Sequence, residues 1–458
     1  MGSEKKKIAT VKSAVKAARQ FAMQVMRPAG IELDRMNDPA RVIAPDSVLW
    51  EVHRQFRREG FHKAMIIKAY GGWMEDMPHT SWPLMGEQLG YGDAGLGISL
   101  AASCMPFAMC VLSAEPEVRR LAQQFAEDTE ASMVGCWGIT EPDHGSDWVL
   151  GCTDEGCNPR VSPSLRAVKK GNEYILNGMK SAWVSNGTIS THAVLHVGLD
   201  ASRGMHGQGI AFCPLDLPGI SRGKPLDKIG QRPLNQGELI FDEVRLPAKY
   251  MLSRKPGVMA IGMVARRFLG TANHETGMLF AGLARAAFDE ALNYARQNSR
   301  GGRLLFDQQR VRLQLFQMFT RVEAASALAH KVSGLMMPPP PTGIAKAIRG
   351  TKGSMAFTGK ALKLFLDNYD SLNRKPWFRD AMERAGRSAQ GRRGMWGVAH
   401  KIVATQTAYD VASDAMQILG HDALDRRYPV EKMFRDARAS LIEDGVNEAL
   451  ALAASVDL

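Results

Sequence analysis

The spacing of apolar residues changes twice along the chain, and this pattern most constrains what the sequence can fold into. In residues 1–134 apolar side chains recur every three or four positions, which predicts amphipathic helices. Residues 135–250 hold short alternating segments separated by Gly, Pro and Asn, which predict β-strands joined by turns. Helical spacing returns in residues 251–458. We therefore expect an α+β protein, mainly α, with a helical domain, a middle β domain and a C-terminal helical bundle.

The C-terminal helical region is interrupted between about residues 335 and 397. Four consecutive prolines, Pro338 to Pro341, favour an extended spacer over a helix. Much of the formal net charge of +11 lies in the Lys- and Arg-rich stretch that follows. Its basic residues are not interleaved with aromatic ones, so we interpret it as a solvated insertion and predict no nucleic-acid partner.

Cysteine, histidine and hydropathy patterns exclude several other classes. The sequence has six scattered cysteines and starts without the apolar core of a secretory signal, so we expect a cytoplasmic protein without disulfides. The uncharged stretch Ala94–Ala114 contains Pro106 and several glycines, which favours a buried helix over a membrane span. His192 and His196 fit one face of a strand, and we predict no metal site.

Two motifs in the β region carry groups suited to bind a cofactor. The first runs CWGITEPDHGSD from Cys136 to Asp147, and its hydroxyls and turn N–H groups can bind the polar edge of a ring or an anion. The second runs LNGMKSAWVSNG from Leu176 to Gly187, and Trp183 offers a flat face for stacking. Taken alone, the first would be ordinary turn chemistry and Trp183 a core residue.

Two further motifs follow. One is GQRPLNQGELIFDEVRLP at 230–247, a turn and a strand. The other combines QILG at 417–420, RYPVEKMFRDAR at 427–438 and IEDGVNE at 442–448. A carboxylate immediately before a glycine at a helix end can project into a cleft, and here Asp444, preceded by Glu443, stands directly before Gly445. On spacing alone both would be surface acids.

The four motifs together, in this order, resemble those of the acyl-CoA dehydrogenase family across nearly the whole chain outside the insertion. The resemblance implies a helical N-terminal domain, a middle β-barrel-like domain and a C-terminal four-helix bundle, assembled as a homotetramer or dimer. It also implies FAD as cofactor, an acyl-CoA thioester as substrate and electron-transferring flavoprotein as electron acceptor.

The resemblance further implies which residues bind FAD. Six should lie near the flavin, and three should contact the adenine of a neighbouring subunit's FAD. The first group is Trp137, Ile139, Thr140, Ser146, Trp183 and Ser185, and the second is Gln309, Gln417 and Gly420. The match is weaker for the second group, because Asn298 and Gly301 replace the usual Arg and Phe of the R-x-x-F-G motif.

In this family a carboxylate removes the α-proton of the thioester while the β-hydrogen leaves as hydride to flavin N5. The alignment places Asp444 at the usual catalytic Glu and Glu443 at the usual Tyr, so Asp444 is the predicted base and Glu443 the second choice. An alternative base position falls at Ala272, and Glu275 remains a minor candidate. Because Asp is shorter than Glu by about 1.5 Å, we expect a cyclic or branched acyl group.

Two other functions remain open from the sequence. A flavin oxidase on the same fold, similar to the nitroalkane oxidases, would also use an Asp as base and would pass electrons to oxygen. A CoA-binding member with a dead site is a non-enzymatic alternative, and the acid at position 444 weighs against it.

Overall fold

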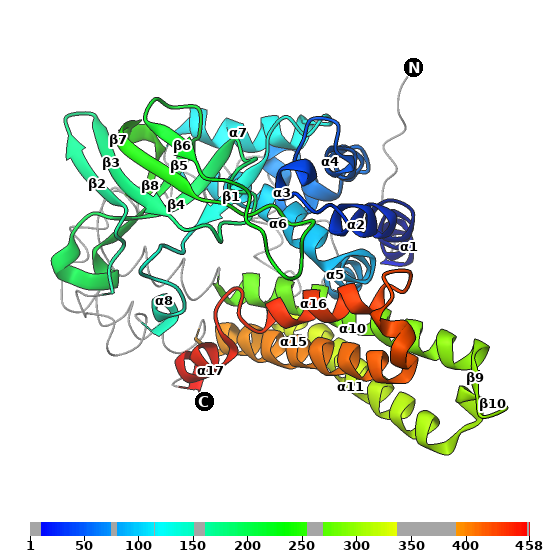
Figure 1. Ribbon diagram of the computed structural model, residues 1–458. Coiled ribbons are helices and arrows are strands. Elements are labelled where there is room, and N and C mark those ends of the chain that lie inside the picture. Colours follow the sequence, from blue (N-terminus) through cyan, green and yellow to red (C-terminus); the bar gives the residue numbers. More distant parts are fainter. Residues whose placement is uncertain are drawn as a thin grey trace, which may run out of the picture.

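The structure is a computed structural model that describes residues 11–74, 80–113, 115–150, 161–253, 269–336, 391–455 and 458. Along the chain, helices are followed by a sheet and then by a second set of helices (Figure 1). This arrangement confirms the predicted α+β, mainly α fold. The exact domain boundaries stay a prediction.

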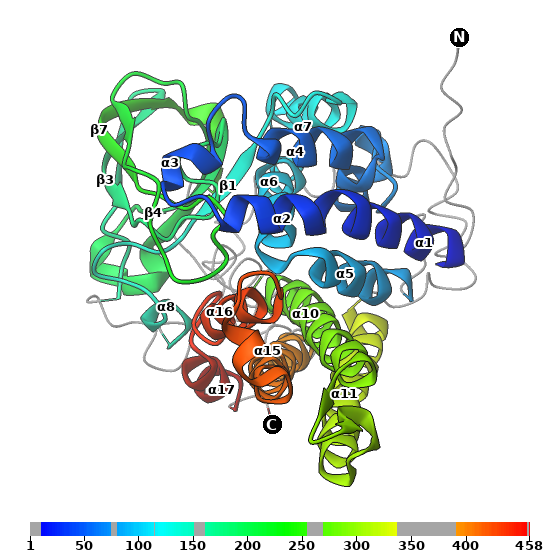
Figure 2. The same ribbon diagram turned by 45° about the vertical axis from the view of Figure 1, so that its right-hand side comes forward.

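The N-terminal helices pack against one another and against one face of the sheet, where Phe107 contacts Phe212 (Figure 2). They are α1 (Val11–Phe21), α2 (Arg27–Asp34), α3 (Pro39–Val42), α4 (Val48–Arg58), α5 (Ser81–Gly92), α6 (Ala94–Cys110) and α7 (Pro116–Glu127). Ser47 caps α4 and Asp93 caps α6, each by accepting a hydrogen bond from a backbone N–H of the first turn. The uncharged stretch forms α6, which is buried on nearly all sides, as predicted. No helix in the described part of the chain is long and apolar enough to cross a membrane.

The described middle region contains one eight-stranded sheet. Its strands are β1 (Gly135–Gly138), β2 (Arg166–Lys170), β3 (Glu173–Lys180), β4 (His192–Gly198), β5 (Gln208–Pro214), β6 (Ile220–Arg222), β7 (Leu239–Pro247) and β8 (Met251–Ser253). The order is β6-β7-β3-β2-β4-β5-β8, and β1 pairs in parallel with β4. β1 lies directly against α6, because a Cβ at Gly135 would come within 2.4 Å of Pro106 Cδ. The start of the first motif is thereby held against the N-terminal helices.

The C-terminal helices form a bundle below the other two regions in Figure 1. They are α10 (Leu269–Gln297), α11 (Gln309–Met336), α15 (Gly391–Leu419), α16 (Val430–Ser440) and α17 (Asn447–Ser455), with a small hairpin of β9 (Ser299–Arg300) and β10 (Arg303–Leu304). α10 and α15 approach closely because both present buried alanines to the core, among them Ala284, Ala287, Ala408 and Ala412. α5 crosses α10 at Gly282, where a Cβ would lie 2.0 Å from Glu87 O.

Most of the predicted insertion at 335–397 lies outside the described residues, including its four prolines. Leu335 and Met336 end α11, and residues 391–397 form the first turns of α15. Cys152 and Cys157 also lie outside the described residues.

Candidate active site

The loop between α16 and α17 carries the two predicted catalytic acids. Asp444 has φ +52° and Gly445 has φ +102°, so two successive residues adopt left-handed backbone conformations. A non-glycine residue there is strained, and such strain concentrates at functional sites. Thr276 of α10 donates a hydrogen bond from Oγ1 to Asp444 Oδ2. The turn therefore directs the Asp444 carboxylate toward α10.

Glu443 faces a different partner from its neighbour. Its Oε1 accepts a hydrogen bond of 2.8 Å from Gln231 Nε2, in the loop before β7. Burial and the adjacent charge of Asp444 raise the pKa of Glu443 to about 7, although Gln231 and two lysines, Lys401 and Lys228, act in the opposite direction. Glu443 is thus tied to the loop before β7, whereas Asp444 is directed to the bundle.

A third carboxyl group comes from α10. Glu275 precedes Thr276, and burial, followed by the charge of Asp444, raises the pKa of Glu275 to about 7. The minor candidate from the sequence therefore lies close enough to Asp444 to interact with it electrostatically. Because the pKa values of Glu275 and Glu443 are both raised, the three acids carry fewer than three full negative charges at neutral pH.

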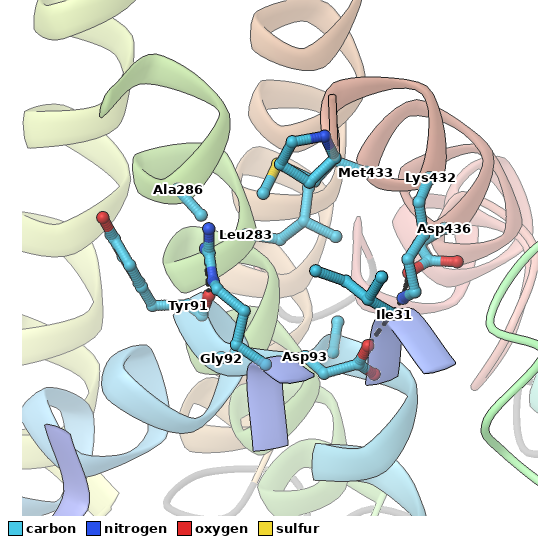
Figure 3. Close-up of a pocket in the computed structure, with 13 residues that line it drawn as sticks. Ile31, Tyr91, Gly92, Asp93, Leu283, Ala286, Lys432, Met433 and Asp436 are labelled. Atoms are coloured by element: carbon cyan, nitrogen blue, oxygen red, sulfur yellow. Dashed lines mark hydrogen bonds and ion pairs between the residues drawn. The ribbon is translucent and has the colours of Figure 1, made fainter. Parts of the chain in front are cut away.

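A buried ion network holds the helix that leads into this loop. Lys432 Nζ lies 2.6 Å from Asp93 Oδ2 and 2.5 Å from Asp436 Oδ2, and these side chains meet beside a cavity of about 20 Å³ (Figure 3). Asp436 also accepts a hydrogen bond from the backbone N–H of Gln231. The network therefore fixes α16 against the start of α6 and orients Gln231, the residue that binds Glu443.

The first motif reaches the same loop. Ser146 Oγ accepts a hydrogen bond of 2.9 Å from the backbone N–H of Val446. His144 Nδ1 lies 2.7 Å from Asp147 Oδ2, a contact within the same turn. Ser146 is thus bonded to Val446, which follows the predicted base Asp444 by two positions. The hydroxyl hydrogen of Ser146 remains available to another acceptor.

The first and second motifs are joined by a buried ion pair. Lys180 Nζ lies 2.6 Å from Glu141 Oε1, and both side chains are fully buried. The backbone N–H of Ser181 donates to Thr140 O at 3.0 Å, and Lys180 Nζ also donates to Ile139 O at 3.3 Å. Thr140 and Ile139 are therefore fixed beside the turn that carries Trp183.

Trp183 has the exposed ring that a stacking role requires. Its side chain is 58% exposed, although its backbone carbonyl accepts a hydrogen bond of 3.1 Å from Gln236 Nε2. Ser185 forms an isolated β-bridge with Gln236, so both residues sit on a fixed turn. An exposed indole on a rigid backbone presents a flat apolar face at low entropic cost.

Trp137 lies on β1, next to the same group of motifs. Its indole Nε1 is buried and has no hydrogen-bond partner among the described residues. A buried donor without a partner is costly, and a bound group with acceptor atoms would satisfy it. Trp137, Thr140 and Ser146 belong to the first motif and Trp183 to the second, and their contacts with a cofactor ring stay a prediction.

The three residues predicted to contact the adenine lie elsewhere. Gln309 begins α11 near the β9–β10 hairpin, and Gln417 and Gly420 lie at the last turn of α15. This end of the bundle is opposite α17 (Figure 1). At Gly420, which has φ +65°, the Arg300 side chain packs closely and donates to Leu419 O at 2.7 Å. Within one chain, these three residues are not brought to the Trp183 site.

The sequence analysis did not assign a role to Thr276 and Gln231, which contact the predicted acids, or to Lys401, which contacts the loop that carries them. Lys401 Nζ is buried in α15 and donates to Gly445 O at 2.9 Å and to Asn447 Oδ1 at 2.8 Å. Two of them carried a signal in the sequence: Gln231 lies in the third motif, and Lys401 stands in register with Ala404, in the apolar stripe of a bundle helix, where a lysine is costly to bury.

Comparison with known proteins assigns the chain to a family. Residues 136–244 match the model of the acyl-CoA dehydrogenase middle domain, and residues 264–354 and 378–454 match that of the acyl-CoA dehydrogenase C-terminal domain. Together the matched ranges cover more than half of the sequence. The chain belongs to the acyl-CoA dehydrogenase family. It is accordingly an oxidoreductase of the acyl-CoA dehydrogenase class.

Individual members of the acyl-CoA dehydrogenase family are distant in sequence. The cyclohex-1-ene-1-carbonyl-CoA dehydrogenase of Syntrophus aciditrophicus (strain SB) is 23% identical over 431 residues, covering 94% of this chain and 85% of that protein. The structure of butyryl-CoA dehydrogenase from Megasphaera elsdenii superposes with a TM-score of 0.74 at 23% identity, covering 100% and 99% of the two chains. A nitroalkane oxidase gives a TM-score of 0.77 at 18% identity, covering 99% and 96%. These likenesses show the fold.

Two buried histidines contact each other inside the helical bundle, one next to Glu275 on α10 and the other next to Lys401 on α15. His274 Nδ1 and His400 Nδ1 lie 2.8 Å apart, and His274 Nε2 lies 2.7 Å from Ser333 Oγ. Burial lowers the pKa of His400 to about 4 and that of His274 well below its usual value. In the folded protein both imidazoles are therefore neutral at pH 7.

These histidines predict a loss of stability in acid. An unfolded histidine binds a proton below pH about 6.5, whereas folded His400 does so only near 4, so the stability present above pH 6.5 is lost as the pH falls between these values. Lowering the pH from 7.5 to 5.5 should reduce the free energy of unfolding by about 1 kcal/mol for each such histidine. Urea titrations of wild type and His400→Gln should show a shallower pH dependence in the variant. Equal slopes would contradict this account.

Proposed function

We propose that this chain is an FAD-dependent dehydrogenase that forms a double bond between the α- and β-carbons of a cyclic or branched acyl-CoA thioester, with Asp444 as the base. The observation that carries the proposal is the setting of Asp444, a strained acid at a helix end that accepts a hydrogen bond from Thr276 and lies near two further acids. Glu443 stays the second choice, because its carboxylate is already engaged by Gln231.

The residues present fit FAD. Trp183 would stack against the flavin, while Trp137, Ile139, Thr140, Ser146 and Ser185 would surround its polar edge. When bound, FAD would accept the β-hydrogen together with the two electrons of its Cβ–H bond, as a hydride. In an assembly of several subunits, Gln309, Gln417 and Gly420 would contact the adenine of a neighbouring copy, and a homotetramer or dimer would provide that contact.

The chemistry asked of the chain itself is removal of a weakly acidic proton. An α-CH beside a thioester becomes acidic enough only if its carbonyl is polarised while the base acts. Thr276 holds the Asp444 carboxylate in one orientation. The Ser146 hydroxyl, which accepts from Val446 N–H, keeps its own hydrogen to donate toward the carbonyl or the cofactor.

The acyl group is inferred from reach. An aspartate places its carboxylate about 1.5 Å closer to its own backbone than a glutamate would, so the α-carbon must approach the turn at Asp444 more closely. A compact cyclic or branched group brings its α-carbon there without requiring a long tunnel. The relative from Syntrophus aciditrophicus, whose name gives a cyclic acyl-CoA as its substrate, supports this choice.

A panel of thioesters tests the proposal. The purified enzyme should be mixed anaerobically with cyclohexanecarbonyl-, isobutyryl-, butyryl- and octanoyl-CoA, and the loss of flavin absorbance followed. A cyclic or branched thioester should reduce the flavin at least about tenfold faster than the linear ones. Preference for octanoyl-CoA would exclude the proposed acyl class, and a flavin that no thioester bleaches would argue for a CoA-binding protein with a dead site.

A flavin oxidase similar to the nitroalkane oxidases is the second candidate, favoured by the aspartate at position 444. Electron acceptor and substrate separate the two functions. Slow reaction of the reduced enzyme with air, and fast reaction with electron-transferring flavoprotein, would support the dehydrogenase. Rapid reoxidation by air together with flavin reduction by a nitroalkane would support the oxidase.

Trp183 provides a test of the cofactor site that does not depend on turnover. Trp183→Ala removes the exposed face proposed to stack on the ring, so FAD should bind about tenfold more weakly, equivalent to about 1 kcal/mol of lost stacking. Trp183→Phe retains an aromatic face and should recover most of the affinity. Titration of the apoprotein with FAD, followed by flavin fluorescence, measures both. Equal affinity of the Ala variant and the wild type would remove Trp183 from the site.

A further inference from the structure

Lys401 is a buried charge whose surroundings differ from those of an ordinary ion pair. It lies on α15, in register with the buried Ala404 and Ala408, and its side chain is fully enclosed. Burying an ammonium group is costly unless its three hydrogens and its charge are compensated. The charge at position 401 therefore needs a reason beyond packing of the bundle.

Within the described residues, both side-chain hydrogen bonds of Lys401 go to the loop that carries the acids. Its Nζ donates to Gly445 O at 2.9 Å and to Asn447 Oδ1 at 2.8 Å, and Asn447 Nδ2 in turn donates to Thr405 Oγ1 at 3.1 Å. The backbone N–H of Asn447 also closes the loop onto Leu441 O at 3.2 Å. The turn at Asp444 is thereby fastened to α15 immediately after its strained residue.

The positive charge of Lys401 is compensated by nearby carboxylates that it does not contact directly. In the part of the chain that the structure describes, no carboxylate lies within contact distance of Lys401 Nζ, so both its direct partners are neutral oxygens. Burial lowers the pKa of Lys401 to about 8, while the charges of Asp444, Glu443 and Glu448 act in the opposite direction. Because no single carboxylate pairs directly with the Lys401 ammonium, its charge interacts with Asp444, Glu443 and Glu448 together.

Other titratable groups lie on the helices packed against this loop. α10 carries Glu275, which interacts with Asp444, and beside it His274; α15 carries His400 next to Lys401, and the two neutral histidines contact each other. Lys228, in the loop before β7, donates to Leu234 O at 2.8 Å and to Gln236 Oε1 at 2.5 Å, and its charge acts on Glu443. Lys401, unlike Lys228, is hydrogen-bonded to the loop itself.

We infer that Lys401 is a positioning residue for the catalytic base: it holds the strained turn at Asp444 against α15, and its positive charge favours the ionised form of the carboxylates near that turn. The inference rests on the proposed role of Asp444. Loss of the ammonium should therefore disturb proton removal in a pH-dependent way, whereas loss of a hydrogen bond alone should not.

Proton removal can be followed without oxidation of the substrate. Phenylacetyl-CoA has α-hydrogens but no hydrogen on an sp³ β-carbon, so it cannot be dehydrogenated. Exchange of its α-hydrogens in D₂O, observed by NMR with the FAD-loaded enzyme, reports the base alone. The exchange rate is measured from pH 5 to 9. It should fall at low pH, where the base becomes protonated (the acid limb), and reach a constant plateau at higher pH.

Lys401→Met should move the acid limb upward by about one pH unit or more, because an opposite charge nearby favours the ionised acid. The exchange rate near the middle of the wild-type limb should then fall about tenfold and recover at higher pH. Lys401→Arg retains the charge and should leave the limb in place. Asn447→Ala removes one hydrogen bond but keeps the ammonium, so the plateau can fall while the limb stays.

Asn447→Asp provides a second route if Lys401→Met does not fold. The new carboxylate is nearly isosteric, pairs directly with Lys401 and neutralises its field, so the acid limb should again move upward. A limb unchanged in Asn447→Asp, or in a folded Lys401→Met, overturns the inference. Asp444→Asn separates this failure from that of the proposed function: exchange that persists in Asp444→Asn rejects Asp444 as base, whereas loss of exchange there with unmoved limbs rejects only the role of Lys401.

Discussion

Replacing Asp444 by Asn should slow flavin reduction by the preferred acyl-CoA about 10³-fold, within the range that a positioned general base contributes. The amide is nearly isosteric with the carboxylate, and its oxygen can still accept the hydrogen bond from Thr276. The turn should therefore keep its shape while the base is lost. Stopped-flow absorbance under anaerobic conditions measures the rate, and the flavin content of the purified variant shows whether FAD is still bound.

Glu443→Gln and Glu275→Gln are the matched controls for this prediction. Both remove a neighbouring carboxylate of raised pKa, and both keep the size of the side chain. Glu443→Gln retains a partner for Gln231 and should cost far less than Asp444→Asn. If Glu275→Gln caused the larger loss, the base would lie on α10, and if Glu443→Gln did, the second choice from the sequence would be the base.

The order of helices and strands could be predicted from the sequence because its signal is local. The 3-4-3 spacing of Tyr409, Ala412, Met416 and Leu419 predicts one helix face, and in the structure Ala412 and Leu419 are buried in the bundle core while Tyr409 and Met416 pack partly buried against it. Motif resemblance added the fold class, which depends on how the regions pack. Local spacing could not supply that packing, because the contacts between α6 and β1 join residues distant in the sequence.

The candidate site was predicted only in part. Asp444 could be proposed from the motif, but its orientation depends on Thr276, which precedes it by more than a hundred residues. The role of Lys401 could not be predicted, because a lysine in a helical stretch usually lies on a solvated face. Its partners, a backbone carbonyl and an asparagine, have no sequence signature. Residues that position a base are thus harder to predict than the base.

Motif residues also differ in what they do. Glu141 and Lys180 are central to the first two motifs, yet both are fully buried and bind each other, so no cofactor or substrate is needed to explain them. Glu141 also accepts from the backbone N–H groups of Ser164 and Leu165, at 2.5 and 3.1 Å. Their role is to hold the two motifs together, and the expected result of breaking the pair is unfolding.

Lys180→Met should lower the free energy of unfolding by about 3 to 5 kcal/mol, because it leaves a buried carboxylate without its counter-charge. The remaining hydrogen bonds to Glu141 satisfy its oxygens but not its charge, and burial already lowers the pKa of Lys180 to about 8 in spite of Glu141. Urea unfolding monitored by circular dichroism gives the midpoint shift, and loss of FAD should accompany it, since Trp183 lies three residues from the pair.

Two further variants test whether the uncompensated charge of Glu141 causes the loss of stability in Lys180→Met. Arg245→Met breaks the exposed pair with Glu173, whose side chains are 66% and 38% exposed, and should cost no more than about 1 kcal/mol. Combining Lys180→Met with Glu141→Gln removes both charges and should recover part of the lost stability, because a neutral amide is cheaper to bury than a lone carboxylate. A double variant less stable than Lys180→Met would show that the hydrogen bonds of Glu141, and not its charge, hold the two motifs together.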